Sequence, residues 1–301
     1  MEKILVLMSV YNGEKYIKEQ IESIFSQNNV SVTLLIRDDG SSDQTLDIVD
    51  SLSRIYNIDV YNGDNKGSAF SFLDLMSAAN NKLEYQYFAL SDQDDIWQNN
   101  KLSHAIEMLK KTHSDLYVGS LDAFWNEDLS THKVIEGRVY SNFEAMLRNS
   151  VAGCTMVFTG NVLNRISVYK PRYIEMHDSW ILRVCQYTGL KIVADKTPYI
   201  RYRIHGNNVC GASITPYQKV RAHIANLLYH DPKIASKTAH ELLSGYNQYL
   251  QNDEKKYLVI LDRESNIPGR KYKLLKYYRT EKFSNRSRKF DFFFETVFGK
   301  V

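Results

Sequence analysis

The sequence predicts an α/β fold with a mostly parallel sheet that is covered by helices. Apolar segments typical of buried strands alternate with amphipathic helical segments over the first 112 residues. Polar clusters follow three of these strands, at the sheet edge where ligands of parallel sheets bind. A segment rich in Lys, Arg and Tyr follows from residue 215 and predicts a basic helical C-terminal extension.

The first predicted pair is a strand over 3–11 and a helix over 12–27, in which Ile17, Ile21 and Ile24 recur at helical spacing. Further strands are predicted over 32–40, 57–62 and 85–91, and helices over 41–56, 67–79 and 101–111. The second helix opens with Ser and Asp, which are common capping residues. This alternation indicates βα units and therefore a parallel sheet.

Beyond residue 112 the pattern is less regular. Strands are predicted over 115–125 and 154–160, a helix over 177–187, and a strand that leaves the fold over 199–208. We therefore expect a catalytic domain over 1–214, with a nucleotide-sugar half at 1–112 and an acceptor half at 113–214. Residues 215–301 form the expected extension.

Composition and charge restrict the class of protein. The chain has 301 residues, of which 44% are hydrophobic and 24% charged, as in ordinary folded proteins. Its net charge of +3 is uneven, because residues 215–301 hold 17 Lys/Arg against 9 Asp/Glu. Cys154, Cys185 and Cys210 are odd in number and widely spaced, which favours free thiols in a reducing compartment. No stretch is typical of a signal peptide or a membrane span, so a cytoplasmic protein is expected.

Asp92, Asp94 and Asp95 lie within four positions, directly after an apolar run. Such a cluster is either a solvated loop or a cation site, because close carboxylates repel one another. Ile96 and Trp97 stand where a calcium loop would need its third ligand and glycine. Carboxylates held together by apolar flanks suit a hard divalent cation such as Mg²⁺ or Mn²⁺. The other acidic cluster, Asp38-Asp39-Gly40, is equally compatible with a turn and helix cap.

Three stretches, SVYNGEKYI, IRDDGSSDQT and LSDQDDIW, together resemble the inverting glycosyltransferases of family 2, which have the nucleotide-diphospho-sugar transferase (GT-A) fold. The resemblance covers roughly residues 3–210. The stretches GCTMVF, HDSW and YRIHGNN, with SDQDDIW, resemble bacterial rhamnosyltransferases that build surface polysaccharides.

The resemblance implies a donor site and a metal site. Tyr11 would stack on the pyrimidine, and Asp39 would accept a hydrogen bond from its ring N–H. The donor-binding residues implied as a group are Ser9, Tyr11, Asn12, Asp39, Asn65, Asp92 and Gln93. Asp94 is the implied metal ligand and His205 would complete the site, although a lone histidine at a strand end is also often structural. Asp92 would lie nearer the ribose or a bridging water.

Asp178 matches the catalytic base of the family, which takes a proton from the acceptor hydroxyl. Its alternative role is an N-cap of the following helix. Gly153, Cys154, Trp97 and His177 are implied on the acceptor side. Cys154 is not expected to act as a nucleophile, because inversion needs no covalent intermediate.

The function implied is an inverting, metal-dependent glycosyltransferase that moves L-rhamnose from dTDP-β-L-rhamnose onto a lipid-linked or growing surface polysaccharide. UDP-galactose, UDP-glucose and UDP-N-acetylglucosamine are alternative donors, since NGDNKGSAF departs from the usual donor-pocket segment. A sugar nucleotidyltransferase would need a Gly-rich loop after the first strand, which YNGEKYI matches poorly. A non-catalytic nucleotide-sugar-binding module is disfavoured by the intact carboxylates, and a donor-hydrolysis assay would discriminate it.

Residues 269–301 hold 10 Lys/Arg and 3 Asp/Glu interleaved with aromatic residues. They form either a helix packed on the catalytic domain or a surface that rests on the inner face of the membrane. Nucleic-acid binding is disfavoured because no recognised module accompanies the charge. The expectation is a cytoplasmic enzyme peripherally associated with the cytoplasmic membrane, with no nucleic acid as a partner.

Overall fold

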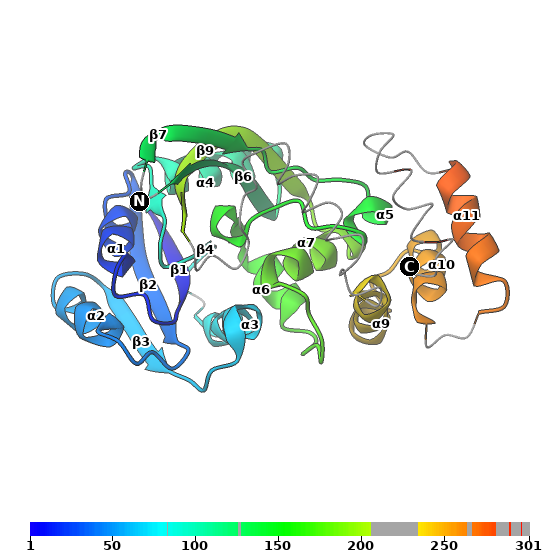
Figure 1. Ribbon diagram of the computed structural model, residues 1–301, viewed down its shortest axis with the longest axis horizontal. Coiled ribbons are helices and arrows are strands. Elements are labelled where there is room, and N and C mark those ends of the chain that lie inside the picture. The colour runs from blue at the N-terminus through cyan, green and yellow to red at the C-terminus, as the bar shows by residue number, and fades with distance from the viewer. Residues whose placement is uncertain are drawn as a thin grey trace.

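The computed structural model describes residues 1–82, 84–125, 128–205, 234–263 and 267–280, together with residues 289 and 296. The strands are β1 (Glu2–Val10), β2 (Val30–Asp38), β3 (Ile58–Asn62), β4 (Tyr87–Ser91), β5 (Ile96–Trp97), β6 (Leu116–Trp125), β7 (Asp128–Ile135), β8 (Val157–Thr159) and β9 (Ile192–Ile204). Within the described residues these strands form one sheet of order β3-β2-β1-β4-β8-β6-β9-β5, with β7 paired to β6 (Figure 1).

The helices are α1 (Ile17–Phe25), α2 (Thr45–Ser53), α3 (Gly67–Ala79), α4 (Lys101–Thr112), α5 (Asn142–Ala145), the 3-10 turn η1 (Gly153–Thr155), α6 (Gly160–Ile166), α7 (His177–Tyr187), α9 (Ile234–Tyr246), α10 (Asn252–Leu261) and α11 (Arg270–Thr280). The first half of the chain confirms the predicted alternation. β3, β2, β1 and β4 are parallel neighbours, and each of β1, β2 and β3 is followed by a helix that crosses back to the next strand.

Two hydrophobic clusters cover the two faces of the sheet. Alternate residues of β1 enter different clusters, because successive side chains of a strand point to opposite faces. Ile4, Val6 and Met8 pack with side chains from α1, α2 and α4. Leu5 and Leu7 belong to the cluster that α3, α6 and α7 also form. The sheet is therefore buried on both faces, which explains the uninterrupted apolar runs of its strands.

The second half is mixed, and several predictions there needed correction. The segment 154–160 is not one strand, because η1 precedes the short strand β8 and α6 follows it. β9 does not leave the fold: it lies parallel to β6 inside the sheet, and residues 206–208 of the predicted strand lie outside the described part. β5 and β7 were not predicted. Both pair antiparallel with long neighbours, β9 and β6 respectively, so their pairing depends on tertiary contacts.

The described helices of the C-terminal segment pack against the catalytic part of the molecule (Figure 1). Leu242 and Tyr246 of α9 and Leu258 of α10 are fully buried in the cluster that contains Trp180 of α7. The Tyr246 hydroxyl donates to the carbonyl oxygen of Ile166 at 3.2 Å. The expected domain boundary near residue 214 falls outside the described residues. None of the described helices is long and apolar enough to cross a membrane.

Candidate active site

The polar clusters predicted from the sequence converge at one edge of the sheet. β1 pairs in parallel with β2 and β4, so Val10 lies opposite Asp38 and Met8 lies opposite Ser91. The segments that follow these three strands therefore leave the sheet side by side. This is the edge at which open parallel sheets bind ligands.

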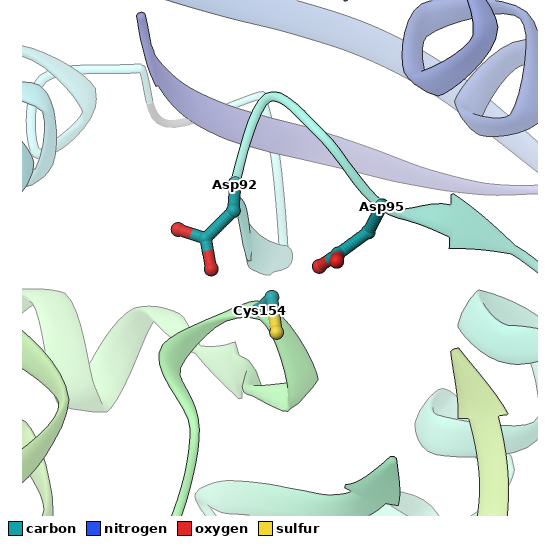
Figure 2. Close-up of side chains that lie close together, drawn as sticks. All are labelled: Asp92, Asp95 and Cys154. Atoms are coloured by element: carbon teal, nitrogen blue, oxygen red, sulfur yellow. The ribbon is translucent and has the colours of Figure 1, made fainter. Parts of the chain in front are cut away.

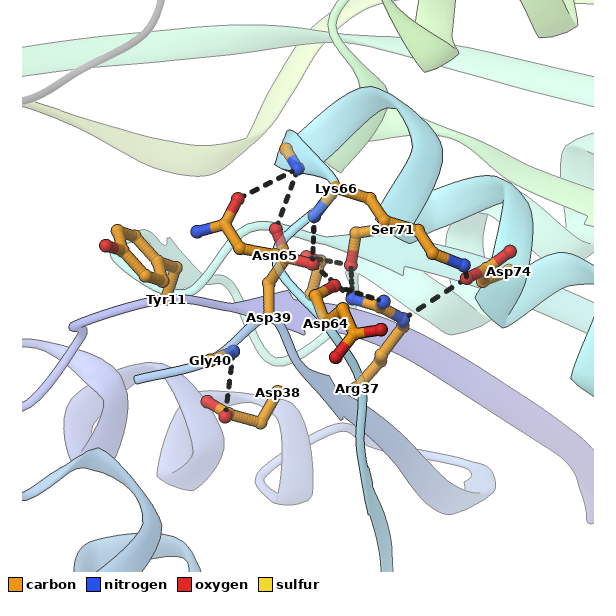
Figure 3. A network of polar contacts seen from close by, with 12 residues as sticks. Tyr11, Arg37, Asp38, Asp39, Gly40, Asp64, Asn65, Lys66, Ser71 and Asp74 are labelled. Atoms are coloured by element: carbon orange, nitrogen blue, oxygen red, sulfur yellow. Dashed lines mark hydrogen bonds and ion pairs between the residues drawn. The ribbon is translucent and has the colours of Figure 1, made fainter. Parts of the chain in front are cut away.

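Arg37, at the end of β2, holds the carboxylate of Asp39 (Figure 3). The two residues are 1% and 2% exposed. Nη1 of Arg37 donates to Oδ1 of Asp39, and also to Oγ of Ser71 at 3.0 Å. Nη2 donates to the carbonyl oxygen of Asp64 at 2.9 Å, and Nε lies 3.5 Å from Oδ2 of Asp74. The guanidinium is thus bonded on every side and fixes the orientation of Asp39.

Asp39 receives two further hydrogen bonds from the loop before α3. Its Oδ1 accepts from the backbone N–H of Lys66 at 3.0 Å, and its Oδ2 accepts from that of Gly67 at 2.9 Å. The same Gly67 N–H lies 3.2 Å from Oδ1 of Asn65. A carboxylate offers about four acceptor positions, so Oδ2 keeps one for another donor. This capacity is what the predicted bond from a base ring N–H needs.

Sequence reasoning missed Arg37 and Ser71. The signal that could have revealed Arg37 was its charge at the end of an otherwise apolar strand. A charged side chain at a buried position needs a partner. Gly63 belongs to the same arrangement, because a Cβ at this position would lie 2.3 Å from Nη2 of Arg37. The Ser71 hydroxyl also lies 2.6 Å from that of Ser9, which connects the predicted donor residue of β1 to the network.

The loop after β1 is clamped by Gln93. The backbone N–H of Tyr11 donates to Oε1 of Gln93 at 2.9 Å, and Nε2 of Gln93 donates to the carbonyl oxygen of Tyr11 at 3.1 Å. Asn12 has a left-handed φ of 48°, and its Oδ1 accepts from the N–H of Ser42 at 2.8 Å. Gln93 and Asn12 therefore act within the protein as loop supports. These bonds to Gln93 use only the backbone of Tyr11, and the residue is 49% exposed.

Asp92 and Asp95 descend from the turn between β4 and β5 toward Cys154 of η1 (Figure 2). One ligand atom from each of the three lies within 4.8 Å of the others. Burial, together with the nearby carboxylates of Asp94 and Asp178, raises the pKa of Asp92 to about 7. Burial likewise raises the pKa of Asp95 and of the Cys154 thiol well above their usual ranges. In the described part of the chain, Oδ2 of Asp95 has no hydrogen-bond partner.

Asp94 and His205, the predicted metal ligands, lie together beside this group. Nε2 of His205 is 2.9 Å from Oδ2 of Asp94, and the imidazole stacks on Tyr16 with centroids 5.0 Å apart. Arg203 supports the turn, since its Nε donates to the carbonyl oxygen of Asp94 at 3.0 Å. Its Nη2 also lies 2.5 Å from Oε2 of Glu19 in α1. This is a second support that the sequence did not reveal.

The donor set at this position fits a divalent cation. Carboxylate oxygens and imidazole nitrogens are ligands that Mn²⁺ or Mg²⁺ accepts. Within the described residues, however, the group whose ligand atoms lie within 4.8 Å of one another is Asp92, Asp95 and Cys154, and the predicted pair of Asp94 and His205 lies beside it. Cys154 is a weaker candidate, because burial keeps its thiol protonated. The excess of carboxylates is itself destabilising, and a cation would remove the repulsion among them.

Lys101 lies beneath the turn. Both Lys101 and Trp97 are 2% exposed, and Nζ of Lys101 lies 3.4 Å from the centroid of the Trp97 ring. Burial lowers the pKa of Lys101 to about 7, against the opposing effect of Cys154 and Asp95. Trp97 and Cys154 are both almost completely buried. They support the turn from below in this structure, and their predicted contact with an acceptor stays a prediction.

Asp178 lies at the start of α7 and is 7% exposed. Its role as an N-cap was wrong: α7 begins at His177, and the cap position is held by Met176, which makes no side-chain capping bond. Oδ1 of Asp178 accepts from the N–H of Ser179 at 2.6 Å. Asp178 is near enough to Asp92 to raise the pKa of that carboxyl group. The predicted base and the acidic turn therefore share one site.

His177 is buried between Phe72 and Gly153. Its ring stacks on Phe72 with centroids 4.0 Å apart, and burial lowers its pKa despite the neighbouring Asp178. Neither ring nitrogen has a hydrogen-bond partner in the described residues. A Cβ at Gly153 would lie 2.3 Å from Nε2, so the glycine is needed to admit the imidazole. Both ring nitrogens are buried in this structure, so the predicted contact of His177 with an acceptor stays a prediction.

Comparisons with known proteins identify the family of this chain. The family model for Glycosyl transferase family 2 matches residues 5–171, which is more than half of the chain. The dTDP-rhamnosyl transferase RfbG of Shigella flexneri is 28% identical over 218 residues, which cover 69% of this chain and 75% of that protein.

A second relative and one solved structure extend the comparison. The UDP-Glc:alpha-D-GlcNAc-diphosphoundecaprenol beta-1,3-glucosyltransferase WfgD of Escherichia coli is 30% identical over 181 residues, covering 56% of this chain and 66% of that protein. The crystal structure of S. aureus TarS 1-349 in complex with UDP-GlcNAc superimposes with a TM-score of 0.58 at 18% identity, covering 97% of this chain and 89% of that one. The predicted GT-A fold is thereby confirmed. The chain belongs to glycosyltransferase family 2 and is a glycosyltransferase.

Proposed function

We propose that this enzyme is an inverting, metal-dependent rhamnosyltransferase that uses dTDP-β-L-rhamnose and acts on a lipid-linked or growing surface polysaccharide. The observation that carries the proposal is the meeting of Asp178 with the acidic turn at one sheet edge, seen in the effect of Asp178 and Asp94 on the pKa of Asp92. One carboxylate lies on the side of the helix α7 and the others lie on the sheet. A sugar bound between them would have a base on one side and a leaving group on the other.

In the proposed reaction, the acceptor hydroxyl oxygen attacks the anomeric carbon as the bond from that carbon to the diphosphate oxygen breaks. The hydroxyl proton passes to a carboxylate oxygen of Asp178. Direct displacement on the face opposite the diphosphate inverts the anomeric configuration, so a β-linked donor gives an α-L-rhamnosyl product. His177 would contribute to the acceptor side by packing its buried ring on Phe72, and Gly153 leaves the room that this ring occupies.

The proposed cation, Mg²⁺ or Mn²⁺, would be held by Asp94 with His205, and Asp92 would contact it through water or contact the ribose. When bound, it neutralises the negative charge that develops on the departing diphosphate. Neighbouring residues would fix the position of these ligands. Arg203 of β9 bonds to the turn and to Glu19 of α1, and Trp97 packs against Lys101 beneath the turn.

The donor nucleotide would lie over β1 and β2. Tyr11 offers an exposed ring to the base, and Asp39 offers its remaining acceptor position to a ring N–H. Ser9, Asn12, Asn65 and Gln93 shape this part of the site, mostly through the loop contacts described above. The choice of rhamnose is supported by the similarity to the rhamnosyl transferase of Shigella flexneri. A UDP-sugar donor is the second candidate, because the relative from Escherichia coli is named for UDP-glucose.

A lipid-linked acceptor is supported by that same relative, whose named acceptor is a diphosphoundecaprenol. An acceptor of this kind stays in the membrane, so the enzyme would work as a cytoplasmic protein held at the inner face of the cytoplasmic membrane. The basic C-terminal segment is the part of the chain whose charge suits such contact.

A screen of nucleotide sugars for metal-dependent release of the nucleoside diphosphate tests the proposal. We expect turnover with dTDP-β-L-rhamnose and none after excess chelator. Turnover with UDP-glucose, UDP-galactose or UDP-N-acetylglucosamine alone would replace the donor while retaining the reaction. Release of free nucleotide that is indifferent to chelator would remove the metal from the mechanism.

A further inference from the structure

We propose that a pocket between α10 and α11 binds an anionic phospholipid, with the phosphate headgroup among lysines and the upper hydrocarbon chain on an apolar floor. This inference deepens the membrane contact proposed above and rests on it. The pocket has a volume of about 740 Å³ and lies on the C-terminal helices, apart from the residues of the active site. Figure 1 shows α10 and α11 at the end of the molecule away from β1 and β2.

Four lysines give the pocket its charge. Lys255 and Lys256 line it from α10, and Lys273 and Lys276 line it from α11. The nearby carboxylate of Asp253 lies 2.9 Å from Lys256, but these side chains are 95% and 70% exposed, so water screens the pair. The charge of the pocket is therefore positive and complements a phosphate group.

The sequence of α11 strengthens this charge. The helix carries Arg270, Lys271, Lys273, Lys276 and Arg279 and no acidic residue. Cationic side chains close to an anionic membrane surface attract it over about a Debye length.

Apart from Asn252, the remaining lining is apolar. Val259 and Ile260 of α10 and Tyr277 of α11 contribute to the pocket. The Tyr277 ring lies 5.0 Å from that of Tyr257 and 5.9 Å from that of Phe143, so the floor is joined to the catalytic part of the molecule. A free phosphate ion would leave this apolar surface in water, whereas a lipid would cover it with hydrocarbon. The lining thus favours a lipid over the inorganic ion.

Tyr272 lies beside the pocket and is 76% exposed. It precedes Lys276 by four positions, so the two side chains share one side of α11. Exposed tyrosines next to basic residues are suited to the headgroup level of a bilayer, where the ring is shielded and the hydroxyl stays hydrated.

Co-sedimentation of the full chain with vesicles tests the site. We expect binding to phosphatidylcholine vesicles that contain phosphatidylglycerol, with weaker binding at high salt. Lys273→Glu should lower vesicle partitioning by about tenfold or more. Lys271→Glu makes the same charge change on the same helix at a residue outside the pocket, and it should have a much smaller effect. Equal losses in both variants would show diffuse charge attraction and overturn the pocket.

Calorimetric titration with soluble dihexanoyl phosphatidylglycerol measures the pocket without a bilayer. We expect binding that Lys273→Glu abolishes, with much weaker binding of dihexanoyl phosphatidylcholine and of inorganic phosphate. Phosphate that binds as tightly as the lipid, or duplex DNA that competes better than the lipid, would overturn the proposal.

Donor hydrolysis without vesicles separates this inference from the proposed function. It should be unchanged in Lys273→Glu. Lipid binding in a wild-type protein that hydrolyses no donor would count against the enzyme proposal and leave the pocket intact.

Discussion

The proposed nucleotide side of the site, around Asp39, and its proposed metal side, around Asp92 and Asp95, differ in whether their buried charges have partners. They are called the nucleotide side and the metal side below. On the nucleotide side, Asp39 is paired with Arg37 and with two backbone N–H groups, and Arg37 has partners on every side. On the metal side, Asp92, Asp95 and Cys154 crowd together, and burial raises the pKa of each. Oδ2 of Asp95 and Nζ of Lys101 lack hydrogen-bond partners in the described residues.

This difference indicates that the two sides would bind their parts of the substrate in different ways. A fully bonded carboxylate is pre-organised and recognises a base by geometry. A crowded set of carboxylates lowers the free energy of unfolding of the free protein, because the carboxylates repel one another. A bound cation would raise that free energy again. We therefore expect changes on the metal side to affect turnover most, and changes on the nucleotide side to affect donor affinity and the free energy of unfolding.

The largest effect is expected for Asp94→Asn. Transfer should fall by about 10⁴-fold or more, and metal-dependent donor binding should be lost, because the variant lacks the charged ligand. The midpoint of thermal unfolding should stay the same or rise slightly as repulsion is removed. Asp50→Asn, the same change at an exposed pair with Arg54, is the control and should leave activity unchanged. Wild-type turnover in Asp94→Asn would contradict the metal assignment.

Asp178→Asn should retain donor binding and lose about 10²–10⁴-fold in kcat, because an amide cannot take the acceptor proton. Single-turnover kinetics and calorimetric donor binding measure the two properties separately. Glu175→Gln, three positions earlier and paired with Arg183, serves as the control. A loss of only a few-fold would place the base elsewhere, and Asp122 in β6 would be tested next.

Arg37→Met tests the nucleotide side. Removing one partner of a buried pair should cost about 3–5 kcal/mol in the free energy of unfolding, since Asp39 loses its counter-charge. Donor affinity should also fall, with a smaller change in kcat. Urea unfolding and donor titration provide the two measurements. Arg54→Met removes an exposed pair with Asp50 and should cost no more than about 1 kcal/mol. Similar costs in both variants would show that the Arg37 network contributes little.

The smallest effect concerns pH. Burial lowers the pKa of His177 below the value of about 6.5 in an unfolded chain, so the unfolded protein takes up this proton first. The contribution of His177 to stability is therefore complete above pH 6.5 and is lost as the pH falls through the lower, folded pKa. Unfolding by urea at several pH values should show a shallower acid decline in His177→Gln than in wild type. His113→Asn, at an exposed histidine, should keep the wild-type slope.

Much of the fold could be predicted because local patterns repeat the tertiary arrangement. The runs of β1, β2 and β4 are uninterrupted and apolar, which is the pattern that a strand buried on both faces requires. The polar residues that follow them reach one edge simply because the strands are parallel. For this reason the sequence could predict that Tyr11, Asp39 and Asp94 lie at the same edge of the sheet.

Most pairings over long sequence separations were not accessible from the residues alone. Arg203 of β9 and Glu19 of α1 are brought together only by the fold. The meeting of His205 with Asp94 was expected only because of the family resemblance. β5 has only two residues, too few for any periodicity, and its existence depends on β9. The segment 154–160 looked like a strand because it is apolar, yet η1 turns it so that Cys154 meets the acidic turn.

The sequence by itself determined the parallel sheet, because hydrophobic periodicity is a local property of the chain. Its motifs also determined the family by resemblance, and that resemblance implied the residues of the proposed donor and metal sites. Only the tertiary structure decided which charges are paired. Asp39 is paired with Arg37, whereas Asp95 and Lys101 each bury a polar atom that has no hydrogen-bond partner among the described residues. In the sequence all four are simply charged residues. The physical reason is that the cost of a buried charge depends on which partners the fold brings within hydrogen-bond distance.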